Sequence, residues 1–404
     1  MDRSPVSTST AVSTVGIIGG GQLAWMMAAA AAKLGIHLVI QTPSQDDPAV
    51  AIAHHTIFAP IADAQATAQM ATQCDVITFE NEFVDLPALK ALEATGVCFR
   101  PRLAVLEPLL DKYHQRSLFR QLDLPTPDFW PLEALHLSPQ YHPTDRTPAL
   151  TWPLVLKTRR HGYDGQGTFV CADQTALTQT LQRLPAVPFL VEAFVPFERE
   201  LAIMAARSHN GEIVLYPVVE TVQEAQVCRR VFVPAAIPPA VSAQVAAIAR
   251  TLLTHLEVVG IFGIELFLTA DHQVLVNEIA PRTHNSGHFS LDACNCSQFE
   301  QHLRAVAGFP LVPPTLKTPG AVMVNLLGYE QSFSDYQAQR KALAALPAAF
   351  VHWYGKAESR PGRKLGHVTV LLPASERSLM AQATAMAQKI ESIWYPTHAE
   401  TSLH

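Results

Sequence analysis

Two glutamates in apolar surroundings are the first residues of this sequence that could do chemistry. Glu265 and Glu278 lie in two apolar stretches, Val258–Leu268 and Gln273–Ile279, whose short connection is typical of a β-hairpin. A turn centred on residues 271–272 places Glu265 opposite Glu278, and two carboxylates in such a cross-strand pair repel each other. A hard cation such as Mg²⁺, held by carboxylates and substrate phosphates, relieves that repulsion. We therefore predict a metal site at Glu265 and Glu278; the alternative is an acid pair that is protonated or paired with lysine.

Two polar residues close to Glu278 could assist such a site. Asn277 offers an amide oxygen, although strand alternation turns its side chain to the opposite face unless the strand bends. Arg282 lies in the polar loop 280–288 that follows. A fixed cation there suits the charge that develops on a transferring phosphoryl group, so we predict a catalytic role for Arg282.

A lysine and a glycine-rich loop predict a phosphate-binding site. Lys157 follows the apolar stretch Pro153–Leu156, and an interior lysine normally needs an anionic partner. The loop Gly162–Gly167 contains three glycines, which let backbone N–H groups approach phosphate oxygens. It lacks the G-K-[ST] ending and the following helix of a Walker A loop. A flexible hairpin without a ligand is the alternative.

A short connector after the next apolar strand could hold a nucleoside. Residues 192–195 read Glu-Ala-Phe-Val, and Glu198 and Glu200 follow closely. Such a connector can offer backbone groups to an adenine edge while a carboxylate accepts from ribose hydroxyls. The alternative is a plain strand end with solvated acids.

The N-terminal glycine turn suggests a second binding edge. Gly19–Ala24 follows the strand Val15–Ile18 and fits the G-x-G-x-x-A form of the dinucleotide fingerprint. Dinucleotide binding also needs an acid at the end of the second strand, where Gln41 stands instead. A structural turn or a polar, phosphorylated substrate fits better. Glu80 and Glu82 end a later strand and should reach the same sheet edge, unless they are only solvated surface acids.

The composition indicates a folded protein that acts on small molecules. The chain has 404 residues, 49% of them hydrophobic, which predicts two or three domains. A net charge of −6 without a Lys/Arg-rich run gives no footprint for nucleic acid. Six scattered cysteines fit reduced thiols in the cytoplasm, and we expect neither a signal peptide nor a transmembrane segment.

The pattern of elements changes along the chain. Strands and helices alternate through about the first 100 residues, which predicts a parallel sheet. Strands then predominate, so the expected fold class is α/β combined with α+β. The expected organisation is a flexible tail (1–14), an N-terminal α/β domain (15–110), a central domain (111–309) and a C-terminal β-rich lobe (310–404).

Taken together, these motifs resemble the ATP-grasp superfamily and, within it, the 5-(carboxyamino)imidazole ribonucleotide synthase family. The likeness runs from about Val15 to Leu371. The motifs that carry it are Gly19–Leu23, the loop 162–167, Phe194–Glu200, Asn277–Arg282 with His284–His288, and Arg360–Lys364 with Gly366-His367.

The resemblance implies a fold and a reaction. The fold would be a Rossmann-like, biotin-carboxylase-like N-terminal domain that binds substrate, an ATP-grasp domain of two subdomains and the small C-terminal lobe. The enzyme would be a ligase of purine biosynthesis that uses ATP and Mg²⁺ to carboxylate 5-aminoimidazole ribonucleotide with bicarbonate, through carboxyphosphate and without biotin. It would be a cytoplasmic homodimer with no nucleic-acid or membrane partner.

The resemblance also implies a role for each matching residue. ATP would contact Lys112, Lys157, His161, Gly162, Tyr163, Asp164, Gly165, Gln166, Gly167, Glu192, Ala193, Phe194, Val195, Glu200, Gln223, Asn277 and Glu278. The nucleotide substrate would contact Gln22, Leu23, Glu82, Tyr163, Asp164, Lys356 and Arg363. Mg²⁺ would bind Glu265 and Glu278, and Arg282 and Asp164 are the catalytic candidates, with Asp164 as a general base.

Five departures from the family pattern leave contact details open. They are Ala24-Trp25, Lys112 for arginine, Gln223 for histidine, Arg229-Arg230 and Thr283. None removes a metal ligand, but lysine does not replace arginine neutrally at a forked contact. Three other functions stay open: a formate-dependent glycinamide ribonucleotide transformylase of the same superfamily, a dinucleotide-binding oxidoreductase, and a catalytically silent nucleotide-binding protein.

Overall fold

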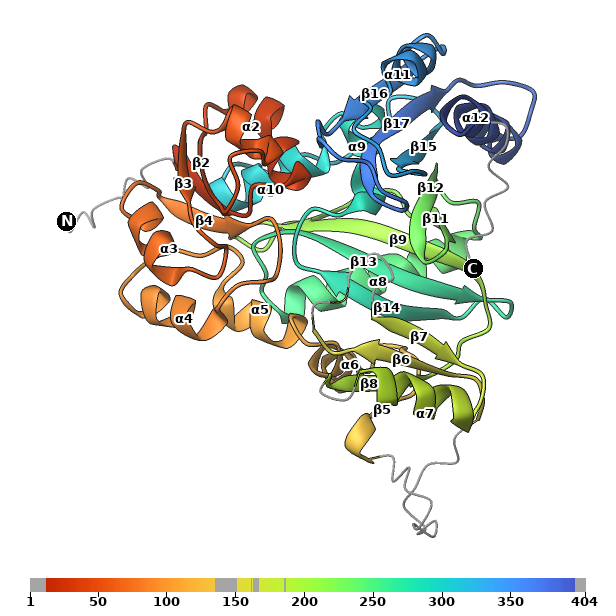
Figure 1. The fold of residues 1–404 in the computed structure, drawn as a ribbon, viewed down its shortest axis with the longest axis horizontal. Helices are drawn as coiled ribbons and strands as arrows, with labels where there is room; N and C mark the ends of the chain where they lie inside the picture. The colour runs from red at the N-terminus through yellow and green to blue at the C-terminus, as the bar shows by residue number, and fades with distance from the viewer. Residues whose placement is uncertain (1–11, 135–150, 161, 163–166, 185–186, 397–404) are drawn as a thin grey trace, which may run out of the picture.

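Three β-sheets organise the chain (Figure 1). The computed structural model describes residues 12–134, 151–160, 162, 167–184 and 187–396. In Figure 1 the N-terminal domain is red to orange, the small sheet below the centre is yellow-green, and the C-terminal segment is blue. No helix within the described ranges is both long and apolar enough to cross a bilayer.

The N-terminal domain is a parallel four-stranded sheet whose strands are joined through helices. Its elements are β1 (Thr14–Ile18), α1 (Gln22–Trp25), α2 (Ala28–Leu34), β2 (His37–Thr42), η1 (Pro48–Ile52), β3 (His55–Phe58), α3 (Ala64–Ala71), β4 (Val76–Phe79), α4 (Leu86–Ala94) and α5 (Leu103–Leu109). The strand order is β3-β2-β1-β4. Because parallel strands end at one edge, Gly19 after β1 lies beside Glu80 after β4. A Cβ on Gly19 would lie 2.7 Å from Glu80 Oε2, and its φ of +111° also requires glycine.

The second sheet is small and antiparallel, with the strand order β5-β8-β6-β7. The elements of this region are α6 (Lys112–Gln121), β5 (Phe129–Pro131), η2 (Leu132–Ala134), β6 (Leu154–Thr158), β7 (Thr168–Cys171), α7 (Gln174–Arg183) and β8 (Phe189–Ala193). Lys157 on β6 pairs with Leu190 on β8, so the predicted phosphate-binding strand and the predicted adenine-binding connector are neighbours.

The third sheet has nine antiparallel strands and crosses the predicted boundary at residue 310. Its order is β14-β13-β9-β11-β12-β15-β17-β16, with β10 beside β9. Because β15 pairs with β12, the segment after 310 extends the central sheet and does not form a sheet of its own. The elements are β9 (Phe197–Arg207), β10 (Ile213–Leu215), β11 (Val219–Glu224), β12 (Val227–Val233), α8 (Pro239–His255), β13 (Gly260–Thr269), β14 (Val274–Ala280), η3 (Asn285–Gly287), α9 (Ser290–Ala293), α10 (Gln298–Ala307), β15 (Gly320–Leu327), α11 (Gln337–Ala344), β16 (Ala349–Trp353), β17 (Lys364–Leu372) and α12 (Leu379–Trp394).

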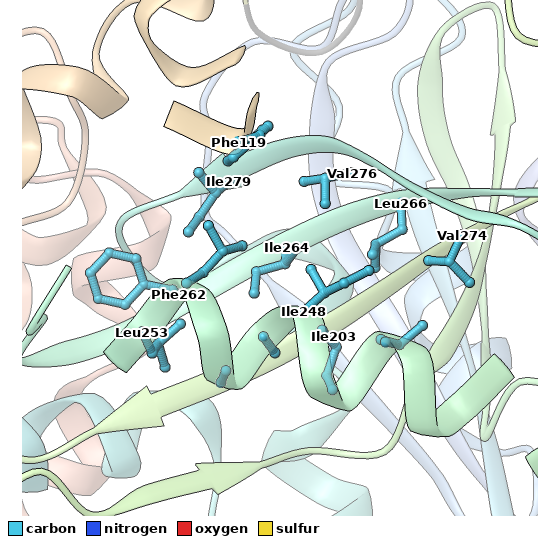
Figure 2. Packing of buried hydrophobic residues seen from close by; sticks show 14 of the residues in the cluster. Phe119, Ile203, Ile248, Leu253, Phe262, Ile264, Leu266, Val274, Val276 and Ile279 are labelled. Atoms are coloured by element: carbon cyan, nitrogen blue, oxygen red, sulfur yellow. The ribbon is translucent and has the colours of Figure 1, made fainter. Parts of the chain in front are cut away.

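An apolar core beneath the β13–β14 hairpin holds it in place. Helix α8 packs against the sheet, where Ile248 and Leu253 face Phe262, Ile264 and other buried side chains (Figure 2). Helix α10 contacts β13 and also packs into the core of the N-terminal domain, although it follows the hairpin in sequence. The hairpin is therefore fixed by burial on a face away from its carboxylates.

We expect Phe262→Ala to lower the free energy of unfolding by about 3–5 kcal/mol, because it removes a fully buried ring from this core. Denaturant unfolding followed by circular dichroism would measure the loss. Phe333→Ala is the matched control, since that ring is 80% exposed and its removal should change stability little. Equal effects of the two substitutions would contradict this account of the core.

Candidate active site

One large cleft collects the predicted site residues from all three sheets. Its volume is about 1130 Å³. The predicted residues that line it are Gln22, Leu23, Glu82, Lys112, Lys157, Gly162, Glu192, Ala193, Phe194, Val195, Glu200, Gln223, Glu265, Asn277, Glu278, Arg282, Lys356 and Arg363. The predicted site residues His161, Tyr163, Asp164, Gly165 and Gln166 lie outside the described residues.

The hairpin places its two acids opposite each other, as predicted, but the strand register that pairs them differs from the predicted one. Near the turn the pairs are centred on Asp271, so the predicted turn centre was wrong. The register then shifts by one residue between the Leu266–Val276 and Glu265–Glu278 pairs. Asn277 is the additional residue of this β-bulge, which supplies the bend that lets it line the same cleft as Glu278.

The pKa values of the two acids are shifted in opposite directions. Burial, followed by the charges of Glu278 and Glu200, raises the pKa of Glu265 to about 7. Burial also disfavours the charge of Glu278, but Lys112, Lys157 and Arg116 together outweigh burial and lower the pKa of that carboxyl. Lys112 Nζ donates to Glu278 Oε2, which joins helix α6 to the hairpin. The lysine contact at Glu278 and the raised pKa of Glu265 are features of the predicted alternative, an acid pair that is protonated or paired with lysine. Two carboxylates in one cleft also supply the oxygen ligands that Mg²⁺ prefers, so the metal site stays a prediction.

Lys157 has the anionic partner that an interior lysine requires. Its Nζ lies 2.8 Å from Glu192 Oε2 and donates to Asn277 Oδ1 at 2.8 Å. The other oxygen of Glu192 accepts from Arg116 Nε at 2.5 Å. Burial acts to raise the pKa of Glu192, but Arg116 and then Lys157 outweigh it and bring the pKa to about 2. Both oxygens of the Glu192 carboxylate are therefore bonded. In the rest of the predicted adenine-binding segment, Ala193–Val195, the side chains are less buried than that of Glu192.

Gln115 lines the cleft and Arg116 contacts two residues that line it, and neither was predicted from the sequence. Gln115 donates from Nε2 to Ile279 O at 3.0 Å and accepts from Ile279 N at 3.1 Å. Their spacing of three and four residues from Lys112 puts all three on one face of α6. That spacing was the available signal, but the surface they face is formed by residues some 160 positions later in the chain.

Other nucleotide-site candidates lie on the large sheet and at the end of the glycine loop. Burial raises the pKa of Glu200 on β9 to about 7, against the opposing charge of Lys157. Gln223 lies where the register between β11 and β12 shifts. Gly167 has φ +85°, and Thr158 N–H donates to its carbonyl at 2.7 Å; this glycine does not line the cleft.

The predicted substrate side combines an acid–cation pair with two further cations. Arg282 Nε lies 2.8 Å from Glu82 Oε1, so these two candidates neutralise each other. Lys356 Nζ donates to Lys364 O at 2.8 Å, and Arg363 donates to Glu358 O at 2.7 Å. Arg363 Nη1 also lies 3.9 Å from Glu358 Oε2. Both cations line the cleft.

The departures at Arg229 and Arg230 have a structural explanation. Both arginines contact Glu391 on α12, at 3.1 Å from Arg229 Nε and 2.8 Å from Arg230 Nε. The guanidinium of Arg229 also lies 3.8 Å from the centre of the Tyr395 ring. They tie strand β12 to the last helix, and neither lines the cleft.

Comparison with known proteins identifies the family. Three family models match: the ribonucleotide synthetase preATP-grasp domain over 12–107, the ATP-grasp domain over 117–299 and the phosphoribosylaminoimidazole carboxylase C-terminal domain over 321–380. The N5-carboxyaminoimidazole ribonucleotide synthase of Synechococcus elongatus is 56% identical over 384 residues, which are 95% of this chain and 96% of the relative. This chain belongs to the N5-carboxyaminoimidazole ribonucleotide synthase family.

Solved structures agree with this membership. The ADP complex of an N5-carboxyaminoimidazole ribonucleotide synthetase superposes with a TM-score of 0.84 at 32% identity, covering 95% of this chain and 98% of that one. The Aspergillus clavatus enzyme, in complex with ADP and 5-aminoimidazole ribonucleotide, gives 0.83 at 29% identity, covering 94% and 98%. The predicted ATP-grasp fold and family are confirmed, N5-carboxyaminoimidazole and 5-(carboxyamino)imidazole being the same group.

We expect Glu265→Gln to stabilise the nucleotide-free protein at pH 8 and to have little effect at pH 4.5. With its pKa raised to about 7, folded Glu265 binds more proton than the unfolded chain between pH 4.5 and 7, so its charge costs stability as the pH rises through that range. Since the side chain is 31% exposed, we expect about 1 kcal/mol, or about 1–2 °C in melting temperature for a chain of this length.

Melting temperatures measured from pH 4.5 to 8 would test this. Glu257→Gln is the control, because that side chain is 68% exposed in a surface pair with Arg102. A Glu265→Gln protein that is less stable than the parent at pH 8 would contradict the repulsion.

Proposed function

We propose that this protein carboxylates 5-aminoimidazole ribonucleotide with bicarbonate at the expense of ATP, in purine biosynthesis. The observation that carries the proposal is the joining of the Glu265–Glu278 pair and the cations Lys356 and Arg363 in one cleft of a chain from this family. A relative solved with ADP and 5-aminoimidazole ribonucleotide supports both ligands.

Mg²⁺ is the cation that the donor set fits, and we propose that Glu265 and Glu278 hold it. When bound, the ion would neutralise phosphate oxygens of ATP. Glu265 has no cation in direct contact among the described residues except His284, whose Nε2 lies 3.5 Å away and which is charged only when protonated. Lys112 and Lys364 act on Glu265 only from a distance. The absence of a permanent cation in direct contact, within the described residues, supports the assignment.

The remaining ATP contacts follow from charge and position. Lys112 and Lys157 would reach phosphate groups, because both ammonium groups lie in the cleft beside the acids. Ala193–Val195 would hold adenine through backbone groups, and Glu200 would accept from ribose hydroxyls. His161–Gly167 would cover the phosphates, and Gln223 would lie close to the nucleoside.

The reaction balances as two displacements. A bicarbonate oxygen attacks the γ-phosphorus, the bond to ADP breaks, and carboxyphosphate forms. The substrate amine then attacks the carboxyl carbon, either in carboxyphosphate itself or in CO₂ released from it. Phosphate leaves, and the amine loses a proton. Arg282 would stabilise charge on the transferred phosphoryl group, with Glu82 holding its guanidinium in place. Asp164 remains the proposed general base, and a closed site would exclude water from the anhydride.

The substrate phosphate would bind Lys356 and Arg363, with Gln22, Leu23, Glu82 and Tyr163 around the rest of the nucleotide. Leu23 N–H donates to Glu80 Oε1 at 3.3 Å, so Glu80 holds the start of α1 against the cleft. Of these two cations, Arg363 can make the stronger contact, because a guanidinium can form two parallel hydrogen bonds to one phosphate. The homodimer implied by the resemblance stays a prediction.

A coupled assay for ADP across substrate pairs tests the activity. We expect ADP with 5-aminoimidazole ribonucleotide plus bicarbonate, and none with glycinamide ribonucleotide plus formate. Glu278→Gln should lower turnover by at least about 100-fold, since it removes a charged ligand of the proposed Mg²⁺, which would neutralise the reacting phosphates. Release of ADP only with formate would establish the transformylase instead, and turnover unaffected by Glu278→Gln would exclude the assigned metal site.

Arg363→Gln should weaken binding of the nucleotide substrate and leave ATP binding unchanged. We expect about a tenfold or greater rise in KM for 5-aminoimidazole ribonucleotide, because a charge-assisted contact to phosphate is lost, with KM for ATP unchanged. Arg377→Gln, at an exposed position, is the matched control. A parallel rise in KM for ATP would show that Arg363 acts on the ATP side of the cleft.

A further inference from the structure

Arg116 is a buried arginine that none of the predicted roles uses. It lies on α6, one turn beyond Lys112, and its side chain is only 3% exposed. A buried guanidinium is retained only where its donors are satisfied, so its partners show what it does.

Those partners belong to two different sheets. Nε donates to Glu192 Oε1 at 2.5 Å, on β8 of the small sheet. The terminal nitrogens reach Asn277 of the large sheet: one donates to its backbone carbonyl, and the other to its Oδ1 at 3.3 Å. Arg116 thus joins the proposed adenine-binding strand to the bulge beside the proposed metal ligand.

The bulge needs such a partner because β14 is the edge strand of the nine-stranded sheet. The outer backbone groups on either side of Asn277 are already bonded: Val276 N–H donates to Pro125 O at 2.7 Å, and both groups of Ile279 pair with the Gln115 amide. The carbonyl of Asn277 is bonded to Arg116. An unbonded carbonyl at this edge would leave the extra residue free to flatten into the regular ladder, which would change the face that Asn277 presents.

Charge balance alone does not account for Arg116. Glu192 already has a second cation in Lys157, at 2.8 Å. A point charge would serve to neutralise a carboxylate, whereas the forked guanidinium reaches the carboxylate and both oxygens of Asn277 together.

We propose that Arg116 is a positioning residue for Mg²⁺-dependent nucleotide binding. It fixes the bulge at Asn277, so that Glu278 stays opposite Glu265, and it couples this geometry to the adenine side through Glu192. The inference rests on the proposed function, which assigns ATP and Mg²⁺ to this cleft.

Calorimetric titration of ADP at a series of Mg²⁺ concentrations tests it without any turnover. Outer-shell partners of metal ligands typically change metal affinity by about 10–100-fold, so Arg116→Met should raise the Mg²⁺ concentration for half-maximal ADP binding by about tenfold or more. Arg116→Lys keeps the charge but loses the fork, and should show a rise in the same direction.

The matched control is Arg120→Met, one turn further along α6. Arg120 lies over the Phe129 ring at 3.9 Å and contacts neither Glu192 nor Asn277, so Mg²⁺ dependence should stay at the parental value. Melting temperatures report folding for every variant, and Arg116→Lys decides the question if Arg116→Met does not fold.

The outcomes distinguish the positioning role of Arg116 from the proposed function. A folded Arg116→Lys protein with parental Mg²⁺ dependence would overturn the positioning role and leave Arg116 as a countercharge of Glu192. Absence of Mg²⁺-dependent ADP binding in the parent protein would instead overturn the proposed function.

Discussion

Repulsion between Glu265 and Glu278 is the constraint on which the rest of the site depends. The hairpin register holds the two carboxylates opposite each other. The apolar core around Phe262 and Ile264 holds the hairpin itself. Neither acid can move apart from the other without breaking that register, so their charges must be balanced by what surrounds them. Helix α6 supplies the balancing charge for Glu278, because Lys112 on this helix forms an ion pair with it. Glu265 keeps a raised pKa, as ionisable groups at functional sites often do, and the bound cation that we propose would balance its charge.

The continuity of the large sheet brings the two halves of the proposed reaction together. Strand pairing runs without interruption from β14, which carries Glu278, to β17, whose start lies beside Arg363. The cations proposed for the substrate phosphate and the acids proposed for Mg²⁺ therefore share one framework. The N-terminal domain adds its own edge, since Gly19–Gly21 and Glu80 approach the same cleft. Packing of α10 against that domain fixes this edge relative to the sheet.

Local patterns predicted much of this arrangement, and long-range contacts supplied the rest. Alternation of strand and helix predicted the parallel N-terminal sheet, and a hairpin turn centred on residues 271–272 predicted the Glu265–Glu278 pairing. The turn centre was wrong, and only the bulge at Asn277 restored the pairing, which no propensity of a single residue indicates. Lys157 was expected to have an anionic partner, but its identity as Glu192 depends on β6 and β8 being adjacent. Arg116 could not be assigned because its partners are 76 and 161 residues away.

The buried polar cluster explains why one helix serves so many contacts. A carboxylate as buried as Glu192, at 2% exposure, is tolerated only when every oxygen is bonded. Lys157 supplies one bond and leaves the other oxygen to Arg116. A second lysine could satisfy that oxygen, but it could not also hold the backbone of the bulge. The need to satisfy Glu192 and the need to shape the edge of β14 thus converge on a single forked side chain. Because Lys112, Gln115 and Arg116 lie on the same helical face, any shift of α6 would disturb the acid pair, the edge strand and the buried carboxylate together.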